Sequence, residues 1–197
     1  MIQPSFVLFI TDQHRADWLG CYGHPVVRTP NIDGIAVNGM TFDRFYVASP
    51  VCQPNRATLA TGRMPSLHGV RTNGISLSLA ANTFIDMLRA SGWRTALIGK
   101  SHLQNFTGLP PVLKAPPMPE GYQAPPKGYD EAEKEDRGDP IYDQESGREW
   151  ESNAAHALRL PYYGFEHVEL CSGHATQVHG NYTRWLRDRR ADGDALR

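Results

Sequence analysis

Short apolar runs alternate with helix-type segments over the first hundred residues, and this alternation is the feature that most constrains the fold. Residues 6–10 form a continuous apolar run rich in β-formers, which is typical of a strand buried on both faces. Thr29 precedes Pro30 as an N-cap precedes the first residue of a helix, and Gly39 is placed to end that helix. Residues 41–48 then alternate as a second strand.

The same pattern continues further along the chain. Asn82 is a candidate cap for a helix that ends at Gly92, and residues 94–98 have the composition of the next buried strand. Residues 165–170 are predicted as a short strand and residues 181–190 as a helix. Strand–helix alternation of this kind predicts an α/β fold with a mixed, mainly parallel central sheet flanked by helices.

Residues 104–160 interrupt this pattern. They are rich in proline at 110–126 and in charged residues at 130–151, with little apolar periodicity, so we expect either a long surface excursion or a partly disordered insert. Three or four strands do not complete a sheet of this kind. We therefore expect residues 1–197 to form the N-terminal portion of a single domain, whose sheet is incomplete at the C-terminal end.

Charge and cysteine content argue against several classes of function. The 197 residues carry 20 Lys and Arg against 21 Asp and Glu, so nothing indicates a nucleic-acid or membrane partner. Three widely spaced cysteines do not form a disulfide framework. The N-terminus has no basic segment followed by a cleavable apolar one, and residues 6–10 are too few to span a membrane, so the expected location is the cytoplasm.

The run Cys52-Gln53-Pro54-Asn55-Arg56 has an unusual backbone. Pro54 fixes its own φ and biases Gln53 toward an extended conformation, so Cys52 is predicted to lie just ahead of a helix start. Backbone N–H groups and the helix dipole favour a bound anion there, and Arg56 adds a fixed positive charge one turn later. The alternative is a buried free cysteine before a proline-started helix.

Polar residues at the ends of two predicted strands are further candidates. Asp12 and Gln13 directly follow residues 6–10, and a carboxylate beside an amide oxygen suits a hard divalent cation. The alternative is a solvated Asp12 that caps a turn. Lys100 and His102 follow another strand, and alternate residues of an extended segment point the same way. They can neutralise a bound anion and protonate a leaving oxygen, or they are a surface lysine with an incidental histidine.

The remaining polar candidates carry weaker signals. Asn73 lies in an Asn-Gly pair, which favours a turn. His68 also lies in a turn, where local hydrogen bonding is the simpler expectation. His174 and His179 match no zinc spacing, so we expect them in a loop near the mouth of a substrate site.

The run from Cys52 to Arg56, with Thr61-Gly62-Arg63 after it, resembles the signature of the sulfatase family. This resemblance implies an alkaline-phosphatase-like fold and the conversion of Cys52 to formylglycine (3-oxoalanine) by a formylglycine-generating enzyme before folding is complete. It also implies that Asp12 is a metal ligand. Sulfatases generally carry a second Asp where this chain has Gln13. In this respect the chain resembles the branch of choline sulfatases and phosphonate monoester hydrolases.

The resemblance assigns roles to the other candidates as well. Cys52, as formylglycine, would be both nucleophile and metal ligand, while Arg56 and Lys100 stabilise charge and His102 is the acid for the leaving group. Lys100 and His102 would contact the sulfate, and Asn73 would point to the substrate as in the phosphonate hydrolase branch. The metal is expected to be Ca²⁺, with Mn²⁺ or Mg²⁺ as alternatives, because only hard ligands are visible.

The reaction implied by this resemblance is the hydrolysis of a small-molecule sulfate ester. A phosphonate or phosphate ester hydrolase of the same fold is an alternative, since the same nucleophile and metal serve both tetrahedral anions. A non-catalytic truncated fragment is another, because the Asp-His metal pair that the family places far downstream is absent from these 197 residues. We expect the chain alone to be inactive, and the full-length protein is compatible with an oligomer.

Overall fold

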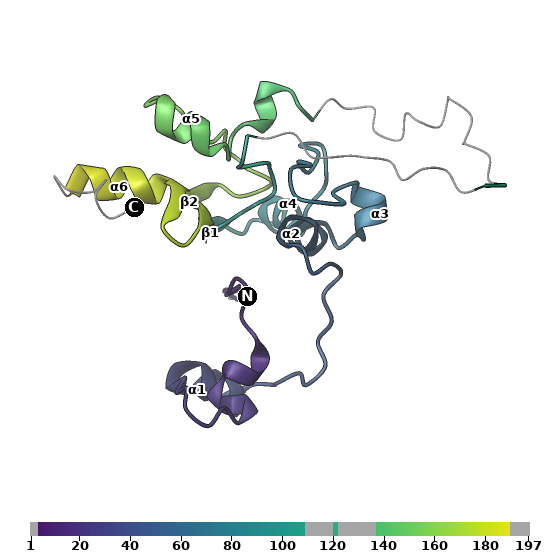
Figure 1. The fold of residues 1–197 in the computed structure, drawn as a ribbon, viewed down its shortest axis with the longest axis vertical. Helices are drawn as coiled ribbons and strands as arrows, with labels where there is room; N and C mark the ends of the chain where they lie inside the picture. Colours follow the sequence, from purple (N-terminus) through teal and green to yellow (C-terminus); the bar gives the residue numbers. More distant parts are fainter. Residues whose placement is uncertain (1–3, 109–119, 122–136, 190–197) are drawn as a thin grey trace. The chain divides into compact units, whose positions relative to one another are not determined.

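The computed structural model describes residues 4–108, 120–121 and 137–189 (Figure 1). The chain divides into two compact units, Met1–Tyr46 and Val47–Arg197, and each is described by itself. Most of the predicted insert, residues 109–119 and 122–136, lies outside the described residues. No helix in the described part of the chain has the length and apolar content needed to cross a membrane.

The first unit is built around helix α1 (Pro30–Asn38), which follows two short 3-10 helices, η1 (Ala16–Trp18) and η2 (Gly20–Tyr22). The predicted signals hold: Pro30 begins α1 and Gly39 follows its last residue. Asp33 joins α1 to η2, because its Oδ1 accepts from the Cys21 N–H at 2.8 Å and from the Thr29 hydroxyl at 2.8 Å.

Residues 6–10 and 41–48, predicted as strands, form no strand in this unit. The five apolar side chains of residues 6–10 are between 49% and 83% exposed, so the prediction of a buried strand is wrong for this structure. The physical reason is that a strand exists through its ladder with another strand. The described residues 4–46 contain no strand that could supply one.

The second unit opens with three helices, α2 (Cys52–Thr61), α3 (Pro65–His68) and α4 (Phe84–Ala90). Helix α2 begins at Cys52 itself, with Val51 as N-cap, so the prediction that Cys52 lies ahead of the helix is corrected by one residue. Pro54 is tolerated at the third position because the first N–H groups of a helix have no intrahelical acceptor. The first bond of the helix accordingly runs from the Asn55 N–H to the Val51 carbonyl.

Helix α4 is capped by Thr83 and not by the predicted Asn82. The Thr83 hydroxyl accepts from the Asp86 N–H at 3.0 Å, and the Asp86 carboxylate accepts from the Thr83 N–H at 3.2 Å. This reciprocal capping box satisfies two N–H groups that the helix leaves without partners.

A small mixed sheet gives the unit its α/β character. Its strands are β1 (Ala96–Gly99), β2 (His167–His174) and β3 (Gln177–Gly180), in that spatial order. β1 and β2 are parallel, with Ala96 opposite His167, whereas β2 and β3 form an antiparallel hairpin. Residues 94–98 and 165–170 were correctly predicted as strands, although Ile98 is 82% exposed and β1 is therefore not buried on both faces.

Strand β3 is missing from the sequence prediction because its four residues contain one aliphatic side chain, Val178. Gly173 permits the hairpin: its φ is 91°, and a Cβ there would lie 2.0 Å from the Gln177 carbonyl oxygen. His174 and His179, expected in a loop, therefore lie on paired strands.

The remaining described elements are η4 (Pro140–Tyr142), α5 (Gly147–Ser152) and α6 (Asn181–Arg189). Helix α6 agrees with the helix predicted at residues 181–190. The first two elements fall within the predicted insert, yet Glu145 and Trp150 are almost completely buried. This part of the predicted insert therefore belongs to the packed interior.

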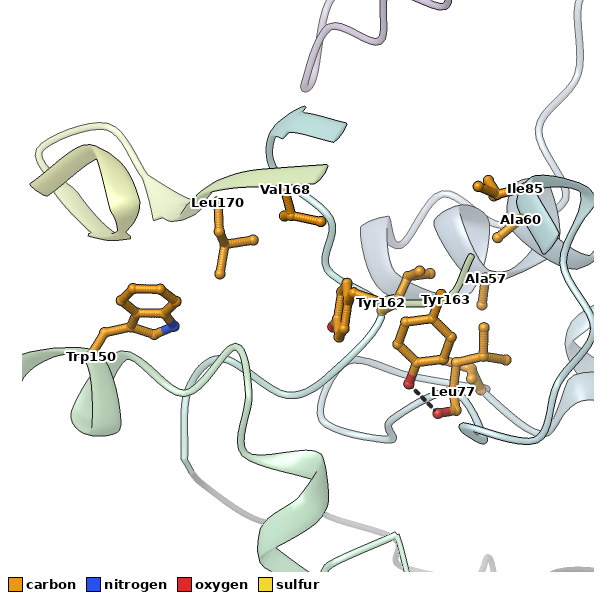
Figure 2. Close-up of a cluster of buried hydrophobic side chains, with 11 residues drawn as sticks. Ala57, Ala60, Leu77, Ile85, Trp150, Tyr162, Tyr163, Val168 and Leu170 are labelled. Atoms are coloured by element: carbon orange, nitrogen blue, oxygen red, sulfur yellow. Dashed lines mark hydrogen bonds between the residues drawn. The ribbon is translucent and has the colours of Figure 1, made fainter. Parts of the chain in front are cut away.

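The hydrophobic core joins helices, sheet and the segment after α5 (Figure 2). Helices α2 and α4 contribute small and aliphatic side chains, β2 contributes aliphatic ones, and a pair of adjacent tyrosines lies between them. The Tyr163 hydroxyl donates to the Leu77 carbonyl, as Figure 2 shows. The buried members are Ala57, Ala60, Val70, Leu77, Ile85, Leu103, Trp150, Tyr162, Tyr163, Val168 and Leu170.

Candidate functional site

Asn73 meets the first turn of α2 at Cys52. Its Oδ1 accepts from the Gln53 N–H at 3.1 Å and lies 3.5 Å from Cys52 Sγ, which donates to it. Cys52 is half-buried at the helix N-terminus, where the helix dipole favours negative charge. The structure thus places two of the sequence candidates, Cys52 and Asn73, in direct contact.

Gln53, which the sequence reasoning missed, fixes the Asn73 turn against α2. It is fully buried, its Nε2 donates to the Ile75 carbonyl at 2.8 Å, and its Oε1 accepts from the Gly74 N–H at 2.7 Å. A buried amide that uses both ends in this way holds the turn in one place. Its partners lie more than twenty residues away, so no local sequence signal identifies it.

Arg56 joins α2 to the end of β1. Its Nη1 donates to the Lys100 carbonyl at 2.6 Å, so the guanidinium group, predicted to face an anion, also holds the backbone at Lys100. A guanidinium has five N–H donors, so this bond leaves others for further acceptors. Two of the predicted site residues, Arg56 and Lys100, are therefore bonded to each other across 44 positions of sequence.

Lys100 and His102 both lie close to the Phe106 ring. The His102 and Phe106 ring centroids are 4.3 Å apart, and Lys100 Nζ lies 5.8 Å from the Phe106 centroid. The sequence predicted that alternation along an extended strand brings these two side chains together. That reason is wrong, because His102 has a φ of 54° and leaves the extended conformation. His102 is only 1% exposed, whereas Lys100 is half-buried.

His174 of β2 completes this group, with its Nε2 2.7 Å from Lys100 Nζ. Its ring also lies 5.8 Å from Phe106, edge to face. Beside it, a cavity of about 300 Å³ has polar walls that include Arg148, Glu151 and His179. The site thus combines cationic and imidazole groups with a polar hollow large enough for a small molecule.

Glu145, also missed by the sequence reasoning, lies beneath this group and is completely buried. Its carboxylate accepts from the N–H groups of His102, Leu103 and Gln104 at 2.8, 2.9 and 3.1 Å, and from the Tyr162 hydroxyl. Burial raises the pKa of Glu145, and these four hydrogen bonds oppose that rise by favouring the carboxylate. Burial also raises the pKa of Tyr162, together with the adjacent charge of Glu145.

Asp12 and Gln13 belong to the first unit and are described with it. Gln13 has a φ of 52°, a left-handed conformation that a residue other than glycine adopts at strained, often functional, positions. An adjacent carboxylate and amide oxygen are donors that a hard cation accepts, so their chemistry fits the expected metal. Among the described residues, no group of three or more His, Cys, Asp or Glu side chains forms a metal cluster.

His68 has local partners, which confirms the simpler expectation for it. Its Nδ1 accepts from the Val70 N–H at 3.1 Å, and its Nε2 lies 3.0 Å from the Thr58 hydroxyl. Burial lowers the pKa of His68, and the charge of Arg137 lowers it further. His68 therefore contributes to packing between α2 and α3.

Comparisons with known proteins agree with the motifs. The sulfatase family model matches residues 4–155. The N-acetylglucosamine-6-O-sulfatase of Bacteroides thetaiotaomicron is 35% identical over 101 residues, which cover 51% of this chain and 18% of that protein. Human arylsulfatase A is 41% identical over 106 residues, which cover 51% of this chain and 21% of that protein.

A solved structure also matches nearly the whole chain. The crystal structure of the phosphonate monoester hydrolase of Agrobacterium radiobacter has a TM-score of 0.55 and 26% identity, covering 93% of this chain and 28% of that one. The chain spans about a fifth of the length of the curated relatives that it matches.

Proposed function

Because the chain belongs to the sulfatase family, we propose that the full-length protein hydrolyses esters of small sulfated alcohols, with Cys52 as formylglycine for its nucleophile. The observation that carries the proposal is the contact of Cys52 with Asn73 at the first turn of α2. It gives the nucleophile position a defined place where a tetrahedral anion is favoured.

Different residues of the chain bind the sulfate group, orient it and donate a proton to the leaving oxygen. The α2 N-terminus and the positive charges of Arg56 and Lys100 attract and orient the anion. Negative charge moves to the bridging oxygen as the ester bond breaks, and His102 supplies a proton to that oxygen. Asn73 fixes the helix start next to the nucleophile by accepting from the Gln53 N–H.

The proposed reaction also needs a bound metal ion and the oxidised form of Cys52. We propose that Asp12 and Gln13 hold a divalent cation, Ca²⁺ before Mn²⁺ or Mg²⁺, with an oxygen of the modified Cys52 as a further ligand. When bound, such a cation lowers the pKa of a coordinated oxygen and makes it a nucleophile near neutral pH. Oxidation of Cys52 requires a formylglycine-generating enzyme as a maturation partner.

A pair of cysteine variants tests the nucleophile. We expect Cys52→Ala in the full-length protein to reduce turnover of 4-nitrophenyl sulfate to background, measured by release of nitrophenol with Ca²⁺ present. Cys21→Ala is the matched control, because Cys21 lies in the first unit beside α1, and it should retain activity. Turnover by Cys52→Ala at the unaltered rate would contradict the proposal.

The second candidate function is hydrolysis of a phosphonate or phosphate ester. It is favoured by the match of 93% of this chain to a phosphonate monoester hydrolase. Gln13 in place of a second Asp also favours this branch. The ratio of kcat/KM for phenyl phosphonate esters and for aryl sulfates, measured on the same full-length preparation, decides between the two substrates.

A further inference from the structure

Glu145 is a buried carboxylate that binds three consecutive backbone N–H groups. Its Oε2 accepts from His102, while its Oε1 accepts from Leu103 and Gln104 and from the Tyr162 hydroxyl. A carboxylate without solvent access is costly to bury unless such bonds replace its water. This arrangement therefore ties Glu145 to the 102–104 backbone.

The two bonds nearest His102 fix its backbone from both sides. The His102 N–H belongs to the peptide group before its Cα, and the Leu103 N–H belongs to the peptide group after it. Holding both groups on one carboxylate restrains φ and ψ of His102 together. The observed φ of 54° is one that residues other than glycine keep only where surrounding contacts determine it.

The segment that carries Glu145 is itself anchored. The Gln144 N–H donates to Gln104 Oε1 at 3.1 Å, the Gly147 N–H donates to the Phe106 carbonyl at 3.0 Å, and the Trp150 indole donates to the Gln144 carbonyl at 2.9 Å. Glu145 thus reaches the His102 backbone from a fixed frame.

We infer that Glu145 is a positioning residue for His102, acting on the backbone conformation that sets its imidazole against Phe106, the ring that Lys100 Nζ also approaches. The inference rests on the proposed function, in which His102 supplies the proton to the leaving oxygen. Loss of the Glu145 carboxylate should move the imidazole away from that oxygen and leave the nucleophile at α2 in place.

Leaving-group dependence distinguishes this role from a general loss of structure. A nitrophenolate leaves without a proton, whereas an alkyl alcohol needs one, so the acid matters for the alkyl ester. In the full-length protein, Glu145→Gln places an NH₂ group against at least one backbone donor. We expect kcat to fall about 100-fold for an alkyl sulfate and about threefold for 4-nitrophenyl sulfate, and we expect His102→Ala likewise to lower kcat more for the alkyl ester than for the aryl ester.

Two further variants complete the design. Tyr162→Phe removes one bond to the same carboxylate but none to the His102 backbone, so kcat should change little for both esters. Glu145→Asp keeps the charge and shortens the side chain, and it provides a folded variant if Glu145→Gln fails to fold. It should show the same dependence on the leaving group with a smaller loss. Equal losses for both esters in Glu145→Gln, or no loss, while His102→Ala depends on the leaving group, would overturn the inference.

Hydrogen exchange provides a readout that does not require sulfatase activity. The peptide covering residues 100–106 should lose protection in Glu145→Gln, measured by mass spectrometry, and keep it in Tyr162→Phe. Unchanged protection in the glutamine variant overturns the positioning role. A third outcome combines lost protection in Glu145→Gln with no leaving-group dependence in His102→Ala. It would refute the proposed function of His102 and leave Glu145 as the residue that fixes this backbone.

Discussion

Cys52 is the residue on which the proposed chemistry depends. Its thiol occupies the first position of α2, and its Sγ and the next backbone N–H share one acceptor, Asn73 Oδ1. The side chain therefore has a defined place before any modification. An aldehyde at the same position would keep its oxygen at the helix N-terminus, where negative charge is stabilised.

We expect Cys52 to carry the aldehyde in active full-length protein from its native host. Trypsin cleaves after Arg44 and Arg56, so residues 45–56 form one peptide whose mass distinguishes the aldehyde from the thiol. The peptide that contains Cys21 provides an unmodified control in the same digest. Active protein whose residue 52 is entirely thiol would refute the formylglycine assignment.

Asp12→Asn should weaken divalent-metal binding at least about tenfold, because an amide oxygen lacks the charge that a hard cation prefers. Elemental analysis of the dialysed full-length protein measures the loss. Asp17→Asn is the matched control, since Asp17 is an exposed carboxylate of the same unit that pairs with Arg15. Equal metal content in wild type and Asp12→Asn would remove Asp12 from the metal site.

At the scale of the elements, the Thr83–Asp86 box fixes where α4 begins. Thr83 is almost completely buried, and its hydroxyl also donates to the Tyr163 carbonyl at 3.0 Å. The cap therefore attaches the helix start to the tyrosine pair of the core.

Thr83→Ala should lower the free energy of unfolding by about 1–2 kcal/mol, because it removes an N-cap acceptor and a buried hydrogen bond. Chemical denaturation followed by circular dichroism measures the change. Thr83→Ser retains the hydroxyl and should lose less than half as much. If serine and alanine destabilised the protein equally, the lost methyl group and not the cap would be the cause.

Helix ends were predictable from sequence because their signals lie within a few residues. Thr29, Pro30 and Gly39 delimit α1 as predicted, whereas α4 is capped by Thr83 instead of Asn82 and α2 begins one residue earlier than predicted. Strands depend on remote partners: residues 94–98 have one in β2, whereas residues 6–10 have none in their unit.

The site shows the same division between local and remote information. The motif predicted a helix close to Cys52, and the family resemblance, not composition or spacing, identified Asn73 as a site residue. Contacts formed across long stretches of chain were invisible, including those of His174 with Lys100 and of Glu145 with the His102 backbone. A buried glutamate in a charged segment has no periodicity that marks it as interior.

At the scale of the whole molecule, the chain covers about a fifth of its curated relatives. The part that the structure describes contains no three-residue metal cluster, and the apolar side chains of residues 6–10 are exposed. Exposed apolar surface of this kind favours association.

We therefore expect residues 1–197 alone to be inactive and prone to aggregate. The short chain and the full-length protein would be assayed side by side on an aryl sulfate with Ca²⁺ or Mn²⁺, and light scattering would report their association. A hard cation usually takes six or more oxygen ligands, and we propose three for it within residues 1–197, from Asp12, Gln13 and residue 52. A soluble, monomeric and comparably active short chain would contradict this account of the metal site.

During synthesis, the contact of Cys52 with Asn73 can form only after both residues have been added to the chain. Its two partners lie 21 positions apart, and ribosomes add about 5–20 residues per second, so roughly 1–4 s pass between them. Until the Asn73 turn is present, the thiol has no acceptor from it, so the modification of Cys52 that we propose would act on a chain in which this contact is still absent.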